Sequence, residues 1–189
     1  MNSFYSDEEL ISLGLKIVGK NVLISRKASI YDAGLISIGS NVRIDDFCIL
    51  SGKIEIGNNV HVAAYSALYG GRDGIYIRDY ANLSSRVSVY SVSDDYSGET
   101  MTNPTILDEY KNVESAPVII DKHVIIGSTS VVMPGVTLRE GSAFGCFSYI
   151  NKDSEPWSIN VGIPFRKIKE RSRNLLELVD RFEKEYFSH

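Results

Sequence analysis

The chain has few of the residues that build disulfide frameworks and metal sites. It contains two cysteines, Cys48 and Cys146, and three histidines among 189 residues. Two cysteines so far apart in sequence form neither a disulfide framework nor a zinc site. Each lies where small residues recur, so we expect both to be reduced packing residues.

Long apolar runs and a strong net charge are also absent. No apolar stretch approaches the roughly 20 residues that cross a bilayer. The first ten residues, MNSFYSDEEL, lack the basic and apolar segments of a signal peptide. We therefore expect a cytoplasmic protein without a transmembrane segment. The formal net charge of −4 provides no general attraction for nucleic acid or anionic lipid, although residues 166–173 form a local basic cluster.

What the sequence does have is an apolar, mostly aliphatic residue at every sixth position over most of its length. Two short slips and one long break, between Val89 and Ile120, interrupt the series. A period of six fits neither one face of a helix nor a long alternating strand. It predicts an all-β solenoid in which each hexapeptide forms one short strand and one corner, with three hexapeptides to a triangular turn and about six coils in all. The 18 positions are Val18, Ile24, Ile30, Ile38, Ile44, Leu50, Ile56, Val62, Leu68, Ile77, Leu83, Val89, Ile120, Ile126, Val132, Leu138, Phe144 and Ile150.

Three segments lie outside this repeat. Residues 1–17 predict a helical cap, because Ser6 and Glu9 have the spacing of a capping box and an apolar face with Leu10 and Ile11 follows. Residues 167–189 predict a C-terminal helix with an apolar stripe. Residues 92–117 have no pattern, and an interruption of this length is usually functional or disordered.

Two strings, IIGSTSVVMPGVTLREGSAFG and VGIPFRKIKER, resemble the hexapeptide-repeat acyltransferases. The resemblance extends from Val18 to about Lys169. It implies a left-handed parallel β-helix over residues 18–166, a homotrimer with active sites between its subunits, and acetyl-CoA as co-substrate. The γ-carbonic anhydrases of the same fold need three histidines at a subunit interface. Here the histidines do not occupy matching coil positions, so we expect no metal.

The general plan is similar to galactoside and maltose O-acetyltransferases. The string DDYSGETMTNP resembles a subgroup found among lipopolysaccharide and capsule sugar acetyltransferases. These resemblances imply transfer of an acetyl group to a hydroxyl or an amine of a sugar or nucleotide-sugar acceptor in surface-polysaccharide synthesis. An antibiotic O-acetyltransferase of the xenobiotic type and a non-catalytic solenoid scaffold are the alternatives.

Acyl transfer needs a base, a donor for the oxyanion and a groove for pantetheine. We favour His61 as the base, because it ends its hexapeptide and points outward. Counting coils stacks it on Arg43, with Asn82 and Ile125 above. His123 is the alternative base, although its position favours a structural corner residue.

The loop histidine of related acetyltransferases is missing here, and Asp94 lies at about that place. Either Asp94 is the base, or it orients a histidine from elsewhere. We prefer the second role, because a carboxylate with an ordinary pKa is a weak base toward a hydroxyl. The acceptor contacts that we expect are Tyr65, Asn82, Asp95 and Tyr96.

The resemblance also places the coenzyme. Small residues at Ser128 and Cys146 let pantetheine lie against the backbone, and residues 151–152 follow the final coil. Basic side chains of the exit string can reach phosphates. The expected coenzyme residues are Ser128, Cys146, Asn151, Lys152, Arg166 and Lys169.

Overall fold

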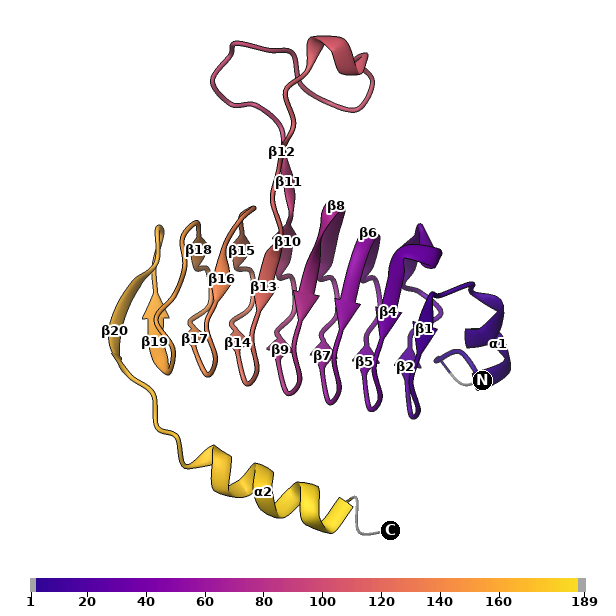
Figure 1. Ribbon diagram of the computed structural model, residues 1–189, viewed down its shortest axis with the longest axis vertical. Coiled ribbons are helices and arrows are strands. Elements are labelled where there is room, and N and C mark those ends of the chain that lie inside the picture. Colours follow the sequence, from indigo (N-terminus) through magenta and orange to yellow (C-terminus); the bar gives the residue numbers. More distant parts are fainter. Residues whose placement is uncertain (1–2, 187–189) are drawn as a thin grey trace.

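The computed structural model describes residues 3–186 and is a parallel β-solenoid with a helix near each end (Figure 1). One face, which we call face 1, stacks seven parallel strands in these residues. They are β2 (Leu23–Ile24), β5 (Arg43–Ile44), β7 (His61–Val62), β9 (Asn82–Leu83), β14 (Ile125–Ile126), β17 (Ala143–Phe144) and β19 (Ser158–Val161).

The other two faces are joined through two long strands, β6 (Ile49–Ile56) and β8 (Ala67–Ile77), whose ends belong to different faces. Face 2 stacks β3 (Ser29–Tyr31), the first parts of β6 and β8, β10 (Ser88–Tyr90), β15 (Val131–Val132) and β18 (Tyr149–Ile150). Face 3 stacks β1 (Ile17–Val18), β4 (Ile36–Ile38), the second parts of β6 and β8, β13 (Val118–Ile120) and β16 (Thr137–Leu138).

The core is the column of residues that the six-residue period predicts. Ile24 and every member of the series from Ile38 to Ile150 are buried, while Val18 and Ile30 are partly buried at the first coil. Small residues between them also face inward. Ser66 Oγ donates to the carbonyl of Ser84 at 3.1 Å, which satisfies a buried hydroxyl. Burial raises the pKa of the Cys48 thiol to about 11, as expected for a reduced packing residue.

The corner that leads into face 1 is built from residues with positive φ. Asparagines occupy it in the early coils, and aromatic residues continue the column in the later coils. The non-glycine members are Asn21, Asn41, Asn59, Tyr80, His123 and Trp157, with φ between 51° and 63°. The Tyr80 and His123 rings stack with centroids 5.1 Å apart, so this corner is covered by ring contacts in the later coils.

The number of coils differs from the prediction of about six. The seventh strand of face 1, β19, continues the parallel stack on β17. Its coil contains Pro156 and Trp157 in place of the aliphatic spacing, so the six-residue period could not reveal it.

The two ends confirm one expectation and correct another. Helix α1 (Asp7–Ser12) begins with the predicted capping box of Ser6 and Glu9, and Leu10 is buried. Ile11, by contrast, is 81% exposed and takes no part in the core.

The prediction of a helix over residues 167–189 was wrong for its first residues. Residues Arg166–Glu170 form strand β20, which pairs antiparallel with β19. This strand satisfies the backbone groups at the edge of the last coil, which a helix would leave unpaired. Helix α2 (Leu175–Tyr186) begins later, and residues 187–189, including His189, lie outside the described part.

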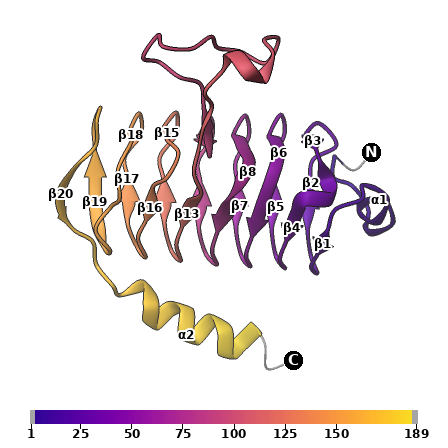
Figure 2. The same ribbon diagram turned by 45° about the horizontal axis from the view of Figure 1, so that its top comes forward.

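The long interruption forms a projecting arm (Figures 1 and 2). Its stalk is the antiparallel pair β11 (Val92–Ser93) and β12 (Glu114–Ser115), and its tip contains the short 3₁₀ turn η2 (Asp108–Tyr110). A second 3₁₀ turn, η1 (Ala33–Leu35), occupies the same corner in the first coil. Every slip of the repeat therefore falls between face 2 and face 3. Within the described residues, no helix has the length and apolarity to span a bilayer.

Candidate active site

His61 lies on β7 in the middle of face 1, in the stack that counting coils predicted. It pairs in register with Arg43 on one side and Asn82 on the other, and Asn82 pairs with Ile125. Because strands of neighbouring coils lie about 4.8 Å apart, outward side chains at one register position form a column. The predicted column is confirmed.

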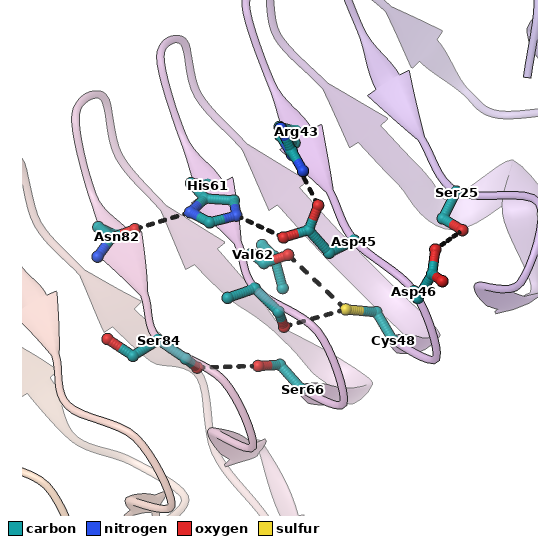
Figure 3. Close-up of polar contacts among 11 residues, drawn as sticks. Ser25, Arg43, Asp45, Asp46, Cys48, His61, Val62, Ser66, Asn82 and Ser84 are labelled. Atoms are coloured by element: carbon teal, nitrogen blue, oxygen red, sulfur yellow. Dashed lines mark hydrogen bonds and ion pairs between the residues drawn. The ribbon is translucent and has the colours of Figure 1, made fainter. Parts of the chain in front are cut away.

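Both ring nitrogens of His61 are in contact with oxygen atoms (Figure 3). Nε2 lies 2.8 Å from Asp45 Oδ2, and Nδ1 lies 3.1 Å from Asn82 Oδ1. Asp45 also accepts a hydrogen bond from Arg43 Nε at 2.7 Å. Burial opposes ionisation of Asp45, but the hydrogen bonds from His61 and Arg43 outweigh it and hold the pKa of this carboxyl below its ordinary value. Asp45 is therefore a carboxylate at neutral pH.

His123 lies in a different environment from His61. It is 8% exposed, and its ring lies against Tyr80 and, at 6.3 Å, Trp157. Burial lowers the pKa of its imidazole. Arg171 Nη1 donates to the His123 carbonyl at 2.8 Å and to that of Gly141 at 2.9 Å. These contacts are those of a packed corner residue of the solenoid.

Tyr65 lies at the corner that follows face 1. Its ring is 53% exposed and stacks on Phe47 at 5.0 Å. Arg86 covers the Tyr65 ring at 5.4 Å, and Lys27 covers that of Phe47 at 5.3 Å. The expected acceptor contact is thus part of an exposed ladder of aromatic and cationic side chains.

Three predicted site residues belong to the projecting arm, which leaves the solenoid away from the face 1 strands (Figures 1 and 2). Asp94 is exposed just beyond the stalk, and Tyr96 is 90% exposed. Asp95 instead folds the arm, because its carboxylate accepts hydrogen bonds from Ser97 N at 2.8 Å and Thr100 Oγ1 at 2.8 Å. These bonds, those of Ser97 first, lower the pKa of Asp95 to about 2.

The predicted coenzyme residues lie in the last coils. Ser128 and Cys146 occupy neighbouring coils at the corner after face 1, where Phe147 N donates to the Ser128 carbonyl at 3.0 Å. Residues 151–152 follow β18 and are exposed, as are Arg166 and Lys169 on β20. Cys146 is exposed, so its expected role as a buried packing residue was wrong. Its exposure suits a surface against which a ligand can lie.

Two residues near His61 were missed in the sequence. Asp45 could not be recognised from the sequence. Its contact with His61 joins two coils and depends on where the two side chains point, which a six-residue period does not encode. Ser84 follows β9 two positions after Asn82, so both side chains lie on the same side of the chain (Figure 3). The alternation along this segment was the available signal.

Comparison with known proteins gives a consistent result. Residues 36–70 match the family model described as bacterial transferase hexapeptide (six repeats). The chain is 52% identical over 178 residues, 92% of each chain, to dTDP-4-amino-4,6-dideoxy-D-glucose acyltransferase of Escherichia coli.

Solved structures extend the comparison. The chain is 56% identical to AntD, an N-acyltransferase from Bacillus cereus in complex with dTDP and 3-hydroxybutyryl-CoA, with a TM-score of 0.96 over 98% of this chain and 99% of that chain. Related AntD structures carry the substitutions D94A, D94N, S84A, S84T or S84C. Galactoside acetyltransferase in complex with coenzyme A, at 23% identity and a TM-score of 0.58 over 93% of this chain and 72% of that chain, shares the fold.

Three findings agree with one another. A hexapeptide repeat builds the solenoid, the family model matches within it, and one relative is 52% identical over nearly the full length. The chain belongs to the hexapeptide-repeat family of sugar acyltransferases.

Proposed function

We propose that this enzyme transfers an acetyl group from acetyl-CoA to the amino group of a dTDP-4-amino-4,6-dideoxy sugar, as a step of surface-polysaccharide synthesis. The observation that carries the proposal is the 52% identity, over 92% of both chains, to an acyltransferase of such a nucleotide sugar. The complex of AntD with dTDP and an acyl-CoA supports both the nucleotide and the thioester.

An amine acceptor changes what the base must do. A neutral amine attacks the thioester carbonyl without prior deprotonation, forming the C–N bond and a tetrahedral oxyanion. The new ammonium group is acidic, so a carboxylate can take its proton. The C–S bond then breaks, and the coenzyme A thiolate leaves and takes up a proton. The objection to a carboxylate, which applies to a hydroxyl acceptor, therefore does not apply here.

Asp94 is our proposed base for this step. Its carboxylate is exposed near the stalk of the arm, free to meet a substrate. Ser84 lies on the outward side of face 1 close to Asn82 and can hydrogen-bond the amine (Figure 3). The AntD variants were made at an aspartate and a serine that carry these same numbers, in a chain that aligns with this one over almost its whole length.

The site is proposed to lie between subunits of a homotrimer. Within one chain the arm projects away from the solenoid at the corner between faces 2 and 3, whereas β7 with His61 belongs to face 1 (Figures 1 and 2). A neighbouring copy placed against face 1 would bring its arm to the His61 column. Light scattering of the purified protein tests the assembly, and a monomer with full activity would exclude it.

The function is tested by incubating the enzyme with acetyl-CoA and dTDP-4-amino-4,6-dideoxyglucose and following free thiol and product mass. We expect a mass increase of one acetyl group on the sugar nitrogen. 3-Hydroxybutyryl-CoA, galactosides and chloramphenicol serve as competing donor and acceptors. Turnover of a galactoside or chloramphenicol but not of the amino sugar would reject the proposal.

Asp94→Asn tests the base. We expect kcat to fall by about 10²-fold or more, the scale of a lost general base, with the KM for acetyl-CoA little changed. Glu99→Gln, which also removes a carboxylate of the arm, is the matched control and should retain activity. Near-normal kcat in Asp94→Asn would return the role of base to His61.

A further inference from the structure

The side chains around His61 are joined by consecutive polar contacts. Arg43 Nε donates to Asp45, and Asp45 Oδ2 accepts from His61 Nε2 at 2.8 Å. On its other side, His61 Nδ1 lies 3.1 Å from Asn82 Oδ1. Both partners are oxygen atoms that accept, so each contact is a hydrogen bond when the ring nitrogen that makes it carries the proton.

The charged side chains that face His61 come from one neighbouring coil. The elements packed against β7 are β5 and β9, and the charged side chains that they present to His61 are Arg43 and the Asp45 carboxylate that follows β5. Asp46, next in sequence, pairs with Lys27 and Ser25 instead. The ring therefore rests against a carboxylate on one side and a neutral amide on the other.

The amide of Asn82 is oriented by this arrangement. With Oδ1 held by His61, its N–H₂ group points away from the ring (Figure 3). Within the described part of the chain, no group accepts a hydrogen bond from this nitrogen, and Asn82 is only half-buried. A donor fixed in direction before substrate arrives loses little freedom on binding.

We infer that His61 is a positioning residue rather than the base, and that it holds the Asn82 amide as a fixed hydrogen-bond donor to an oxygen of the acceptor sugar. The inference rests on the proposed function for the identity of the acceptor. It assigns recognition of the sugar to Asn82, orientation of the Asn82 amide to His61, and orientation of the His61 ring to Asp45.

Asn82→Asp tests the donor with almost no change of shape. The aspartate keeps an oxygen for His61 and replaces the outward N–H₂ with an acceptor. We expect the KM for the amino sugar to rise about tenfold, the effect of one hydrogen bond lost from the complex. The kcat and the KM for acetyl-CoA should change little. An unchanged KM for the sugar would overturn the inference.

Asp45→Asn tests the orientation. In the wild type the Asp45 carboxylate lies against Nε2 and holds the His61 ring with Nδ1 toward Asn82. An amide holds the ring less firmly than a carboxylate, so the KM for the sugar should rise several-fold while kcat changes little. Asp46→Asn removes the adjacent carboxylate and should leave both constants in place. An unchanged KM for the sugar in Asp45→Asn would overturn the inference.

A substrate-free measurement separates this inference from the proposed function. Side-chain ¹⁵N NMR of the full chain reports the protons on His61 directly. A proton on Nδ1 at the pH of the assay supports the arrangement even if another sugar proves to be the acceptor. A bare Nδ1 overturns the arrangement even if the amino sugar is acylated.

Discussion

At the scale of single residues, the distance between coils decides which side chains fit. A Cβ on Gly127 would lie 2.5 Å from Cys146 N and 2.6 Å from the Gly145 carbonyl carbon. Backbone atoms of the next coil cannot move by that amount without breaking the ladder between β14 and β17. Glycine at this position is thus a consequence of close approach.

Gly127→Ala should lower stability by about 1–3 kcal/mol, the usual cost of overpacking. Gly34→Ala is the matched control, because nothing lies within 4 Å of a Cβ there and its φ is not positive. Thermal denaturation compares the two. Equal melting temperatures would show that the coils can separate at little cost.

Single residues also mark where sequence reasoning stops. The buried series was predictable from Ile38 to Ile150, because one period fixes both burial and register. The stacking of Arg43, His61 and Asn82 was predictable for the same reason. The contact of Asp45 with His61 was not, because it depends on how two side chains turn between coils.

At the scale of elements, the sequence predicted a feature correctly where the residues that form it are close together in the chain. The Ser6–Glu9 capping box was predictable from a spacing of three residues, and α1 begins there. The ion pair of Glu9 with Arg26, at 2.5 Å, joins the helix to the second strand and had no local signal. Strand β20 was mistaken for helix because its partner, the edge of the seventh coil, was itself unpredicted.

Glu9 makes the attachment of α1 dependent on pH. The hydrogen bond from Arg26, followed by that from Ser6, lowers the pKa of this carboxyl from 4.5 to about 2. A lowered pKa contributes stability that is complete above the unfolded value and is lost as pH falls through the folded value. The difference in α1 protection between the wild type and Glu9→Gln, measured by hydrogen exchange, should be full at pH 7. It should shrink between about pH 4.5 and pH 2. A difference that grows on acidification would contradict this account.

At the scale of the whole molecule, the solenoid and the arm have separate tasks. The coils repeat one core and give a rigid column of outward side chains on face 1. The slips of the repeat gather at the corner between faces 2 and 3, and the largest of them forms the arm (Figures 1 and 2). A corner leaves the ladders intact, so an insertion there can vary without disturbing the core.

This division predicts complementation between two defective variants. Asp94→Asn damages the arm and Asn82→Leu damages face 1, so in the proposed homotrimer each variant alone has three defective sites. If one copy supplies the arm and its neighbour supplies face 1, a trimer that mixes both variants contains some sites with neither change. Every cyclic trimer that contains both variants has one intact site in three, so the protein purified through both tags should show about a third of wild-type activity. The two variants, co-expressed with different tags and purified through both, provide the measurement. Activity no greater than that of the separate variants would place the arm and face 1 of one site in the same chain.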